Sequence, residues 1–218
     1  MKQNIIFWKK LSRDFASIEK SVFVCYNDKK YEGEVDNMKY MIASDIHGSA
    51  FFARKLLEAF EREGAEKLIL LGDILYHGPR NDLPKGYAPK EVIDMLNHIA
   101  DRILCVRGNC DTEVDQMVLS FPVLADYALF VLNGHSIFAT HGHEYNETSL
   151  PPITRGDILL CGHTHVPKCV KHEKYTYMNP GSVSIPKEDS PNSYMILEED
   201  GAFLWKDLDS SVYMECRD

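Results

Sequence analysis

The segment Lys67-Leu68-Ile69-Leu70-Leu71-Gly72-Asp73 is a continuous apolar run that is broken by a glycine and followed at once by an acidic residue. A run of this kind, preceded by a segment with helical periodicity, is typical of a buried parallel strand. In open α/β sheets, ligands bind just beyond the carboxyl ends of the strands. We therefore predict that Asp73 projects from a strand end into a crevice.

Four other apolar runs also lead into residues with side chains that bind metals. Taken singly, each histidine that follows one of these runs could be either a metal ligand or an ordinary polar residue at a strand end. The asparagine taken alone would be a turn residue. Their common placement favours a single site at one sheet edge. The runs are Tyr40–Ser44 before Asp45 and His47, Ile103–Val106 before Asn109, Ile137–Thr140 before His141, and Ile158–Cys161 before His163 and His165.

Length and composition indicate one domain of ordinary size. The chain has 218 residues, of which 44% are apolar, so it is long enough to bury a sizeable core. The net charge of -9 argues against a nucleic-acid platform or a basic membrane-surface module, because either would concentrate lysine and arginine. The six cysteines show no C-x-x-C pair, so we expect reduced thiols and a cytoplasmic protein.

Residues 1–37 do not resemble the rest of the chain. Lys9–Lys20 predicts a short helix and Ser21–Tyr26 a strand, but no motif connects them to the residues after Met38. Our hypothesis is that residues 1–37 are an N-terminal extension produced by a misassigned start at a position before Met38, and that residues 38–218 form the domain. The alternative is a genuine extra element that packs on the surface.

The first half of the domain predicts alternating strands and helices. Ser49 is a suitable N-cap for a helix that ends at Gly64, and with its flanking strands this helix makes a βαβ unit. A loop from His77 to Pro89 precedes a second helix that begins at Pro89. A third helix is predicted over Thr112–Ser120.

The second half predicts strands and turns. Asn133-Gly134 between two apolar runs is a strong hairpin signal, and Tyr194–Leu197 is expected to pair with Phe203–Trp205. A β-rich half after a βαβαβ half favours an α/β fold with two packed sheets. We predict a four-layer α/β/β/α sandwich of two mixed β-sheets with flanking helices.

The donor types indicate the metal. Imidazole suits first-row transition ions, whereas magnesium and calcium prefer all-oxygen sites. Seven protein donors are more than one small cation needs. Two cations that share Asp73 would use all seven, and each would keep an open coordination position. A water between two such ions would have a lowered pKa and would supply hydroxide for in-line attack on phosphorus. The predicted ligands are Asp45, His47, Asp73, Asn109, His141, His163 and His165.

The order of these motifs resembles the calcineurin-like metallophosphoesterases. The matching signatures, from Met38 to about Pro186, are Asp45-x-His47, Gly72-Asp73, Gly108-Asn109, His141-Gly142-His143 and Gly162-His163-Thr164-His165. His77-Gly78-Pro79-Arg80-Asn81, Arg107–Asp111 and Asn179-Pro180-Gly181-Ser182 resemble more closely the small bacterial YfcE-like phosphodiesterase branch. Each motif alone is weak, but five in order are specific.

The resemblance implies a site with two metal ions, commonly manganese, although zinc, iron or nickel would also suit the donors. One ion would be held by Asp45, His47, Asp73 and His165. The other would be held by Asp73, Asn109, His141 and His163. The resemblance also favours a homo-oligomer with a small-molecule phosphodiester substrate.

Cys110 is the departure from the wider family, whose larger members carry histidine at this position. A thiol is neither a strong donor nor an imidazolium, so we expect weak assistance to the leaving group. Two divalent ions, two carboxylates and one hydroxide leave a charge near +1, which a phosphodiester monoanion balances. We therefore expect diesters with good leaving groups to be preferred.

Three further residues are candidates for substrate binding beside Cys110. They are His77, Arg80 and His143, and each is equally well explained as a solvated loop residue or a neighbour of the ligands. Two alternatives to a phosphodiesterase stay open: a phosphomonoesterase or nucleotidase, and a non-catalytic scaffold with the same fold. A scaffold would be expected to lack ligands, and here none is missing.

Overall fold

The computed structural model of the protein describes residues 22–26 and 38–217. The predicted helix over Lys9–Lys20 lies outside the described residues, and the proposed division at residue 38 stays a prediction. Among the described residues, no helix combines the length and apolar character needed to cross a lipid bilayer.

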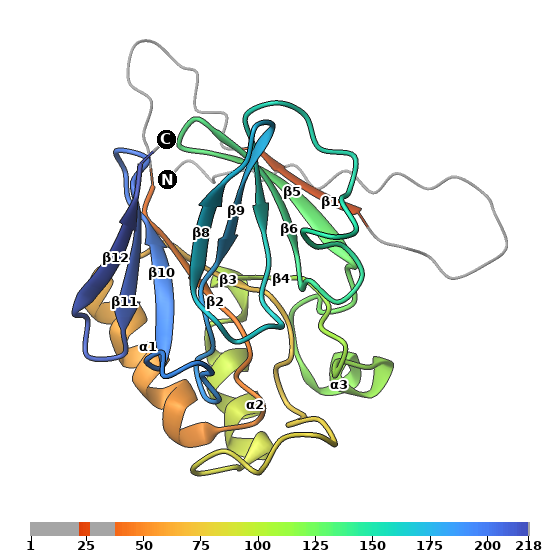
Figure 1. Ribbon diagram of the computed structural model, residues 1–218. Helices are drawn as coiled ribbons and strands as arrows, with labels where there is room; N and C mark the ends of the chain where they lie inside the picture. Colours follow the sequence, from red (N-terminus) through yellow and green to blue (C-terminus); the bar gives the residue numbers. More distant parts are fainter. Residues whose placement is uncertain (1–21, 27–37, 218) are drawn as a thin grey trace, which may run out of the picture.

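Two mixed six-stranded sheets form the body of the described chain (Figure 1). The first, sheet B, has the order β12-β11-β10-β2-β3-β4, in which β2, β3 and β4 are parallel and the other three strands are antiparallel to their neighbours. Its strands are β2 (Tyr40–Ala43), β3 (Lys67–Leu70), β4 (Ile103–Cys105), β10 (Ser193–Leu197), β11 (Phe203–Asp207) and β12 (Val212–Cys216).

The second sheet, sheet A, has the order β1-β5-β6-β7-β9-β8. β6, β7 and β9 run parallel, and β8 closes the sheet antiparallel to β9. At the other edge, β1 pairs with β5 in parallel. Its strands are β1 (Val22–Tyr26), β5 (Tyr127–Leu132), β6 (His135–Thr140), β7 (Asp157–Leu160), β8 (Lys168–Lys171) and β9 (Tyr175–Asn179).

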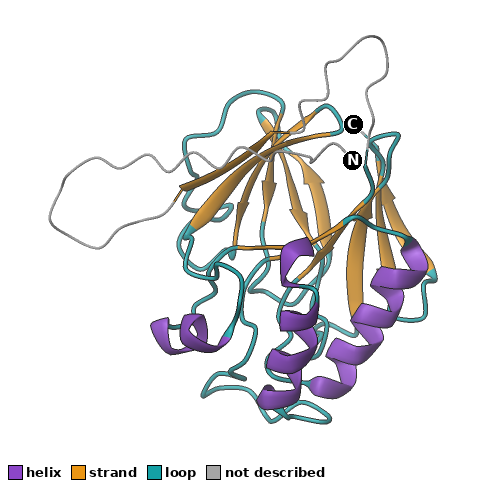
Figure 2. Ribbon diagram, turned by 180° about the vertical axis from the view of Figure 1, so that it is seen from behind, coloured by secondary structure: helices purple, strands orange, loops and turns teal. Residues whose placement is uncertain are grey.

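Capping residues mark both ends of α1 and the start of α3. In α1 (Ala50–Glu63), the Ser49 hydroxyl accepts the amide of Phe52 at 3.2 Å, and Gly64 ends the helix in a left-handed conformation. Helix α2 (Pro89–His98) leads into the 3-10 turn η1 (Ala100–Arg102). A capping box at Thr112 begins α3 (Glu113–Val118). Figure 2 shows α1 and α2 side by side.

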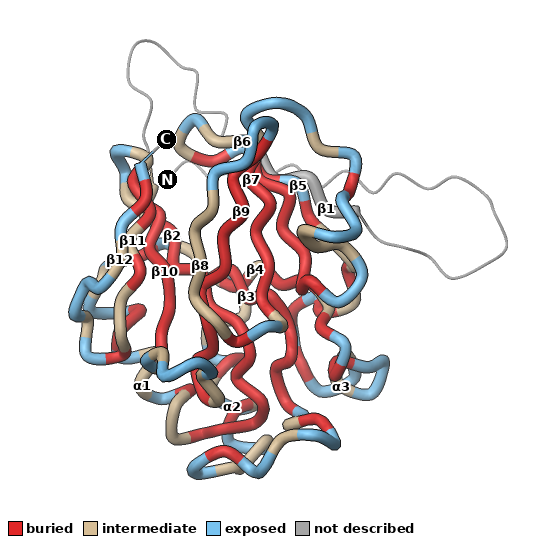
Figure 3. The backbone as a smooth tube through the Cα atoms, viewed as in Figure 1, coloured by how far each residue is buried: buried red, intermediate tan, exposed pale blue. Residues whose placement is uncertain are grey.

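Three apolar clusters define the layers. One joins α1 and α2 to the outer face of sheet B, through residues such as Leu56, Leu96 and Leu70. A second fills the space between the two sheets, and it includes Ile69 and Ile158. The third lies on the outer face of sheet A, where loop residues pack on the strands. Figure 3 shows the central strands buried along their length. The predicted two-sheet sandwich with flanking helices is therefore confirmed.

Local predictions are confirmed except for two edge strands. The Asn133-Gly134 hairpin and the β10–β11 pairing are both present. The strand predicted at Ser21–Tyr26 is present as β1, and it joins sheet A. Strands β8 and β12 were not predicted, because both are short edge strands with weak alternation.

Candidate metal centre

The carboxyl ends of β2, β3, β4, β6 and β7 bring the seven predicted ligands together. The loops after β3 and β4 approach so closely that a Cβ on Gly72 would lie 2.3 Å from the amide nitrogen of Gly108. A Cβ on Gly108 would lie 2.2 Å from Oδ1 of Asp73. These two contacts explain the glycines of the Gly-Asp and Gly-Asn motifs, since any side chain there would separate the loops.

Asp45, His47 and His165 form one half of the cluster. Nε2 of His165 lies 3.2 Å from Oδ1 of Asp45, and Nε2 of His47 lies 3.5 Å from the same oxygen. The two imidazole Nε2 atoms are 3.3 Å apart. All three side chains are buried.

Asp73, Asn109, His141 and His163 form the other half. Nε2 of His141 lies 3.5 Å from Oδ2 of Asp73, 3.1 Å from Oδ1 of Asn109 and 3.2 Å from Nδ1 of His163. Oδ2 of Asp73 is also 3.8 Å from Nε2 of His47. The carboxylate of Asp73 therefore lies between the two halves.

Backbone carbonyls fix three of the imidazoles. His47, His141 and His165 place Nδ1 within 2.6–2.7 Å of the carbonyl oxygens of Tyr76, Leu71 and Ile185 respectively. A carbonyl only accepts, so each ring donates its Nδ1–H there. In the neutral ring, Nε2 is then left with a lone pair that faces the cluster, which is the arrangement that metal-binding histidines adopt.

Five of the candidate ligands have left-handed backbone conformations. The φ angles are 60° at Asp45, 50° at His47, 55° at Asp73, 66° at His163 and 62° at His165. Residues other than glycine seldom adopt this region, and where they do the strain is often found at functional sites. The backbone thus turns sharply at the strand ends and directs these side chains towards one another.

The charges of the cluster are strongly coupled. Burial raises the pKa of Asp45, but the nearby imidazoles of His165 and His47 outweigh burial and hold that pKa well below its usual value. Burial likewise lowers the pKa of His141, but the carboxylates of Asp73 and Asp45 raise it to about 9. Burial and the nearby His141 lower the pKa of His163 to about 4. The carboxylates thus favour positive charge in this cluster.

The donor set fits metal ions. Oδ1 of Asp45 is buried and has no hydrogen-bond partner among the described residues, although two imidazole nitrogens lie near it. A buried carboxylate oxygen without such a bond is costly unless a cation neutralises it. Ligand atoms within 4.8 Å of one another occur in the sets Asp45, His47 and His165, and Asp45, Asp73 and His141.

Of the predicted substrate-binding residues, Cys110 and His143 lie beside this cluster. Cys110 is buried, and its Sγ lies within 4.8 Å of ligand atoms of His47 and Asp73. The ring of His143 is exposed and lies 5.4 Å from that of His141, between ring centroids. His77 packs against Tyr76 and Tyr87, and its buried Nδ1 has no hydrogen-bond partner among the described residues. Arg80 is exposed.

Three buried residues that support the cluster were missed from the sequence. Asp111 accepts the backbone amides of Asp73, Ile74 and Gly108 at 2.8–2.9 Å, and it thereby ties the two motif loops together. Burial raises the pKa of Asp111 to about 6. The hydroxyls of Ser182 and Ser184 donate to the carbonyl oxygen of Asp45. Asp111 and Ser182 stand in the motifs Arg107–Asp111 and Asn179–Ser182, but the motifs alone do not predict these contacts.

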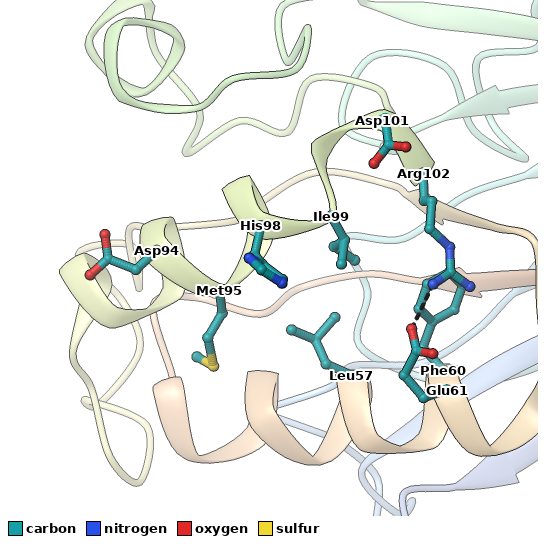
Figure 4. A pocket seen from close by; sticks show the side chains of 9 residues that line it. All are labelled: Leu57, Phe60, Glu61, Asp94, Met95, His98, Ile99, Asp101 and Arg102. Atoms are coloured by element: carbon teal, nitrogen blue, oxygen red, sulfur yellow. Dashed lines mark hydrogen bonds and ion pairs between the residues drawn. The ribbon is translucent and has the colours of Figure 1, made fainter.

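A hollow of about 810 Å³ lies elsewhere, between α1 and the segment from α2 to η1 (Figure 4). Arg102 pairs there with Glu61 at 2.6 Å and stacks on Phe60. None of the residues that line it is a predicted ligand, so it is distinct from the cluster. The lining residues are Leu57, Phe60, Glu61, Asp94, Met95, His98, Ile99, Asp101 and Arg102.

A two-sheet sandwich with a cluster of histidine, aspartate and asparagine at its strand ends indicates a metal-dependent hydrolase. Residues 38–202 match the profile of the calcineurin-like phosphoesterase superfamily domain. The chain belongs to this superfamily.

Individual relatives support the assignment. The chain is 48% identical over 163 residues to phosphodiesterase YfcE of Escherichia coli K12. The aligned region covers 75% of this chain and 89% of that protein. A solved structure of YfcE, described as a phosphoesterase from E. coli, superposes with a TM-score of 0.79 at 46% identity, over 82% of this chain and 98% of that one. Zinc-complexed Vps29 from Entamoeba histolytica shares the fold, with a TM-score of 0.54 and 20% identity over 82% of this chain and 98% of that one.

Proposed function

We propose that the protein is a phosphodiesterase that hydrolyses small-molecule phosphodiesters with two divalent transition-metal ions, of which manganese is the expected metal. The observation that carries this proposal is the convergence of seven donors from five strand ends, with three imidazoles held so that Nε2 faces inward. The similarity to phosphodiesterase YfcE supports the reaction type.

The seven donors would form two overlapping sets. Asp45, His47, Asp73 and His165 would hold one ion, and Asp73, Asn109, His141 and His163 the other. When bound, the ions supply positive charge for the phosphoryl oxygens and a water of lowered pKa. The chain itself orients these donors: carbonyl oxygens fix the three imidazoles, and the amide of Cys110 donates to Oδ1 of Asp73 at 2.8 Å.

The residues beside the cluster favour one substrate class. Burial raises the pKa of Cys110 far above that of a free thiol, so this side chain stays neutral and does not supply a leaving group with a proton readily. His77, Arg80 and His143 are the cationic or polar groups that we propose to contact substrate. A diester monoanion with a good leaving group suits such a site better than a monoester dianion.

Turnover of matched nitrophenyl substrates tests this preference. With manganese present, we expect kcat/KM for a chromogenic diester to exceed that for the corresponding monoester by at least about tenfold, since the site balances one negative charge but not two. Equal or faster turnover of the monoester would favour the phosphomonoesterase alternative. No turnover of either by metal-loaded protein would favour a scaffold.

Cys110→His should raise activity and admit monoesters. An imidazole at this position can donate to the phosphoryl group or leaving oxygen, and general-acid assistance typically contributes about 10²–10⁴-fold. We expect at least about a tenfold gain in kcat for the diester, and measurable monoester hydrolysis. Cys110→Ala is the matched control, for which no gain is expected. A histidine variant that binds metal normally but gains on neither substrate would contradict this role.

Location and assembly are also proposals. We propose a cytoplasmic location because the spacing of the six cysteines shows no C-x-x-C pair or compact disulfide framework. The resemblance supports a homo-oligomer, which light scattering on the full chain can test.

A further inference from the structure

Two cysteines from the edge strands of the two sheets meet in the protein interior. Cys169 belongs to β8 and Cys216 to β12, and their Sγ atoms are 2.7 Å apart. β8 and β12 are the last strands of sheet A and sheet B respectively, and β1 lies at the opposite edge of sheet A (Figure 1). The contact therefore joins strands that share no backbone pairing.

The register of each strand directs these thiols inward. Cys169 is aligned with Met178 of β9, and Cys216 with Phe203 of β11. Met178, Phe203 and Cys216 belong to the apolar cluster between the sheets, and Cys169 packs against it. The side chain of Cys216 is buried, whereas that of Cys169 is half-buried. Both cysteines thus contact the same apolar space, and Cys169 is the more exposed of the two residues.

A second contact holds the two strands together beside the thiols. The Nζ of Lys171 donates to the carbonyl oxygen of Arg217 at 2.8 Å. Lys171 and Arg217 stand two residues after Cys169 and one residue after Cys216. This contact links the end of β8 to the residue that follows β12, on the same side of the sandwich as the thiol pair.

We propose that Cys169 and Cys216 form a reversible disulfide that links the two sheets, so that the pair is a site of oxidative modification. A disulfide bond is about 2.05 Å long, so closing it requires the sulfurs to approach by less than about 1 Å. Disulfides that form in reducing compartments are usually transient, and they act in catalysis or in sensing oxidants.

The reaction balances with a low-molecular-weight disulfide such as oxidised glutathione as the oxidant. The half-buried Cys169 thiolate attacks one sulfur of the oxidant and releases one glutathione thiol. The Cys216 thiolate then attacks Cys169 Sγ and releases the second glutathione. The protein loses two protons and two electrons, and the oxidant gains them as two thiols.

The linkage would restrain the unfolded chain and fix the edge of the sandwich. The two cysteines are 47 residues apart in sequence, and closing a loop of this length restricts the unfolded ensemble substantially. β8 also begins three residues after the candidate ligand His165, so the linkage anchors the strand that leaves the metal centre. We expect the oxidised form to have a Tm about 5–10 °C above the reduced form.

The test uses the full-length, metal-loaded protein, incubated with oxidised or reduced glutathione. The intact mass and the Tm are measured first, and the protein is then denatured, alkylated and digested for peptide mapping. We expect oxidation to lower the intact mass by two hydrogen atoms, to raise the Tm and to join the peptides of Cys169 and Cys216; dithiothreitol should reverse all three. Cys169→Ser and Cys216→Ser should each abolish the rise in Tm. Cys25→Ser is the matched control, because Cys25 stands in β1 at the opposite edge of the sheet, and it should retain the rise.

Several results would overturn the proposal. Complete alkylation of both cysteines after oxidation would do so, as would a linkage between other cysteines. A stable glutathione adduct on Cys169 without closure would show that Cys216 cannot reach it. Because the peptide map is made on the unsubstituted protein, the conclusion stands even if a serine variant folds poorly.

Discussion

Asp73→Asn is expected to lower kcat/KM for a phosphodiester by about 1000-fold or more. The substitution keeps the size of the side chain but removes the charge that lies between the two halves of the cluster, 3.5 Å from His141 and 3.8 Å from His47. Loss of a shared ligand should release metal, and a 1000-fold loss corresponds to about 4 kcal/mol of transition-state stabilisation.

Steady-state kinetics and metal analysis on the same preparation measure this effect. Asp94→Asn is the matched control, because Asp94 is an exposed aspartate of α2 in the separate hollow of Figure 4, and it should leave kcat/KM within about twofold of the original. If Asp73→Asn retained full metal content and more than a tenth of the activity, Asp73 would not be a shared ligand.

Removal of divalent cations is expected to abolish hydrolysis and to be reversible. After treatment with a chelator and dialysis, activity should fall to the background rate, because no side chain in the cluster can replace the metal as a source of nucleophile at neutral pH. Manganese should restore activity, with saturation at about two ions per chain. Magnesium and calcium should restore much less, since four of the seven candidate donors are imidazoles.

Titration of metal-free protein with each ion, followed by the rate of diester hydrolysis, measures this result. Sodium chloride at matched ionic strength is the control for a salt effect. Full activity in the chelator, with far less than one ion bound per chain, would refute a metal-dependent mechanism. Equal rescue by magnesium would refute the inference about the type of metal.

The strand ends were predictable because their signals are local. The run before Asp73 is rich in leucine and ends at glycine, so both the strand and the placement of Asp73 could be predicted from seven residues. The Asn133-Gly134 turn is likewise specified by its own conformational preference, with φ angles of 47° and 86°. Both features could therefore be predicted from the local sequence alone.

The supporting contacts were not predictable because they join segments far apart in the chain. The hydroxyl of Ser182 reaches the carbonyl oxygen of Asp45 across 137 residues, and Asp111 reaches the amide of Asp73 across 38. Neither residue type indicates its partner. The left-handed conformations of His163 and His165 were not predicted either, since only a few per cent of residues other than glycine adopt them.

Edge strand β8 was also not predictable from its own sequence. β8 is only four residues long and begins and ends with lysine, so its apolar signal is two residues, Cys169 and Val170. It becomes a strand because β9 offers an open edge for antiparallel pairing. Tertiary pairing thus decides its structure, and with it the contact between Cys169 and Cys216.

Anomalous X-ray diffraction at the manganese absorption edge, from crystals of the manganese-loaded protein, is the decisive test of a shared two-metal site. We expect two peaks about 3.5–4 Å apart with the carboxylate of Asp73 between them. Asp45, His47 and His165 should surround one peak, and Asn109, His141 and His163 the other. A single peak, or peaks remote from Asp73 in crystals of protein that hydrolyses the diester, would show that the two ions do not share this carboxylate.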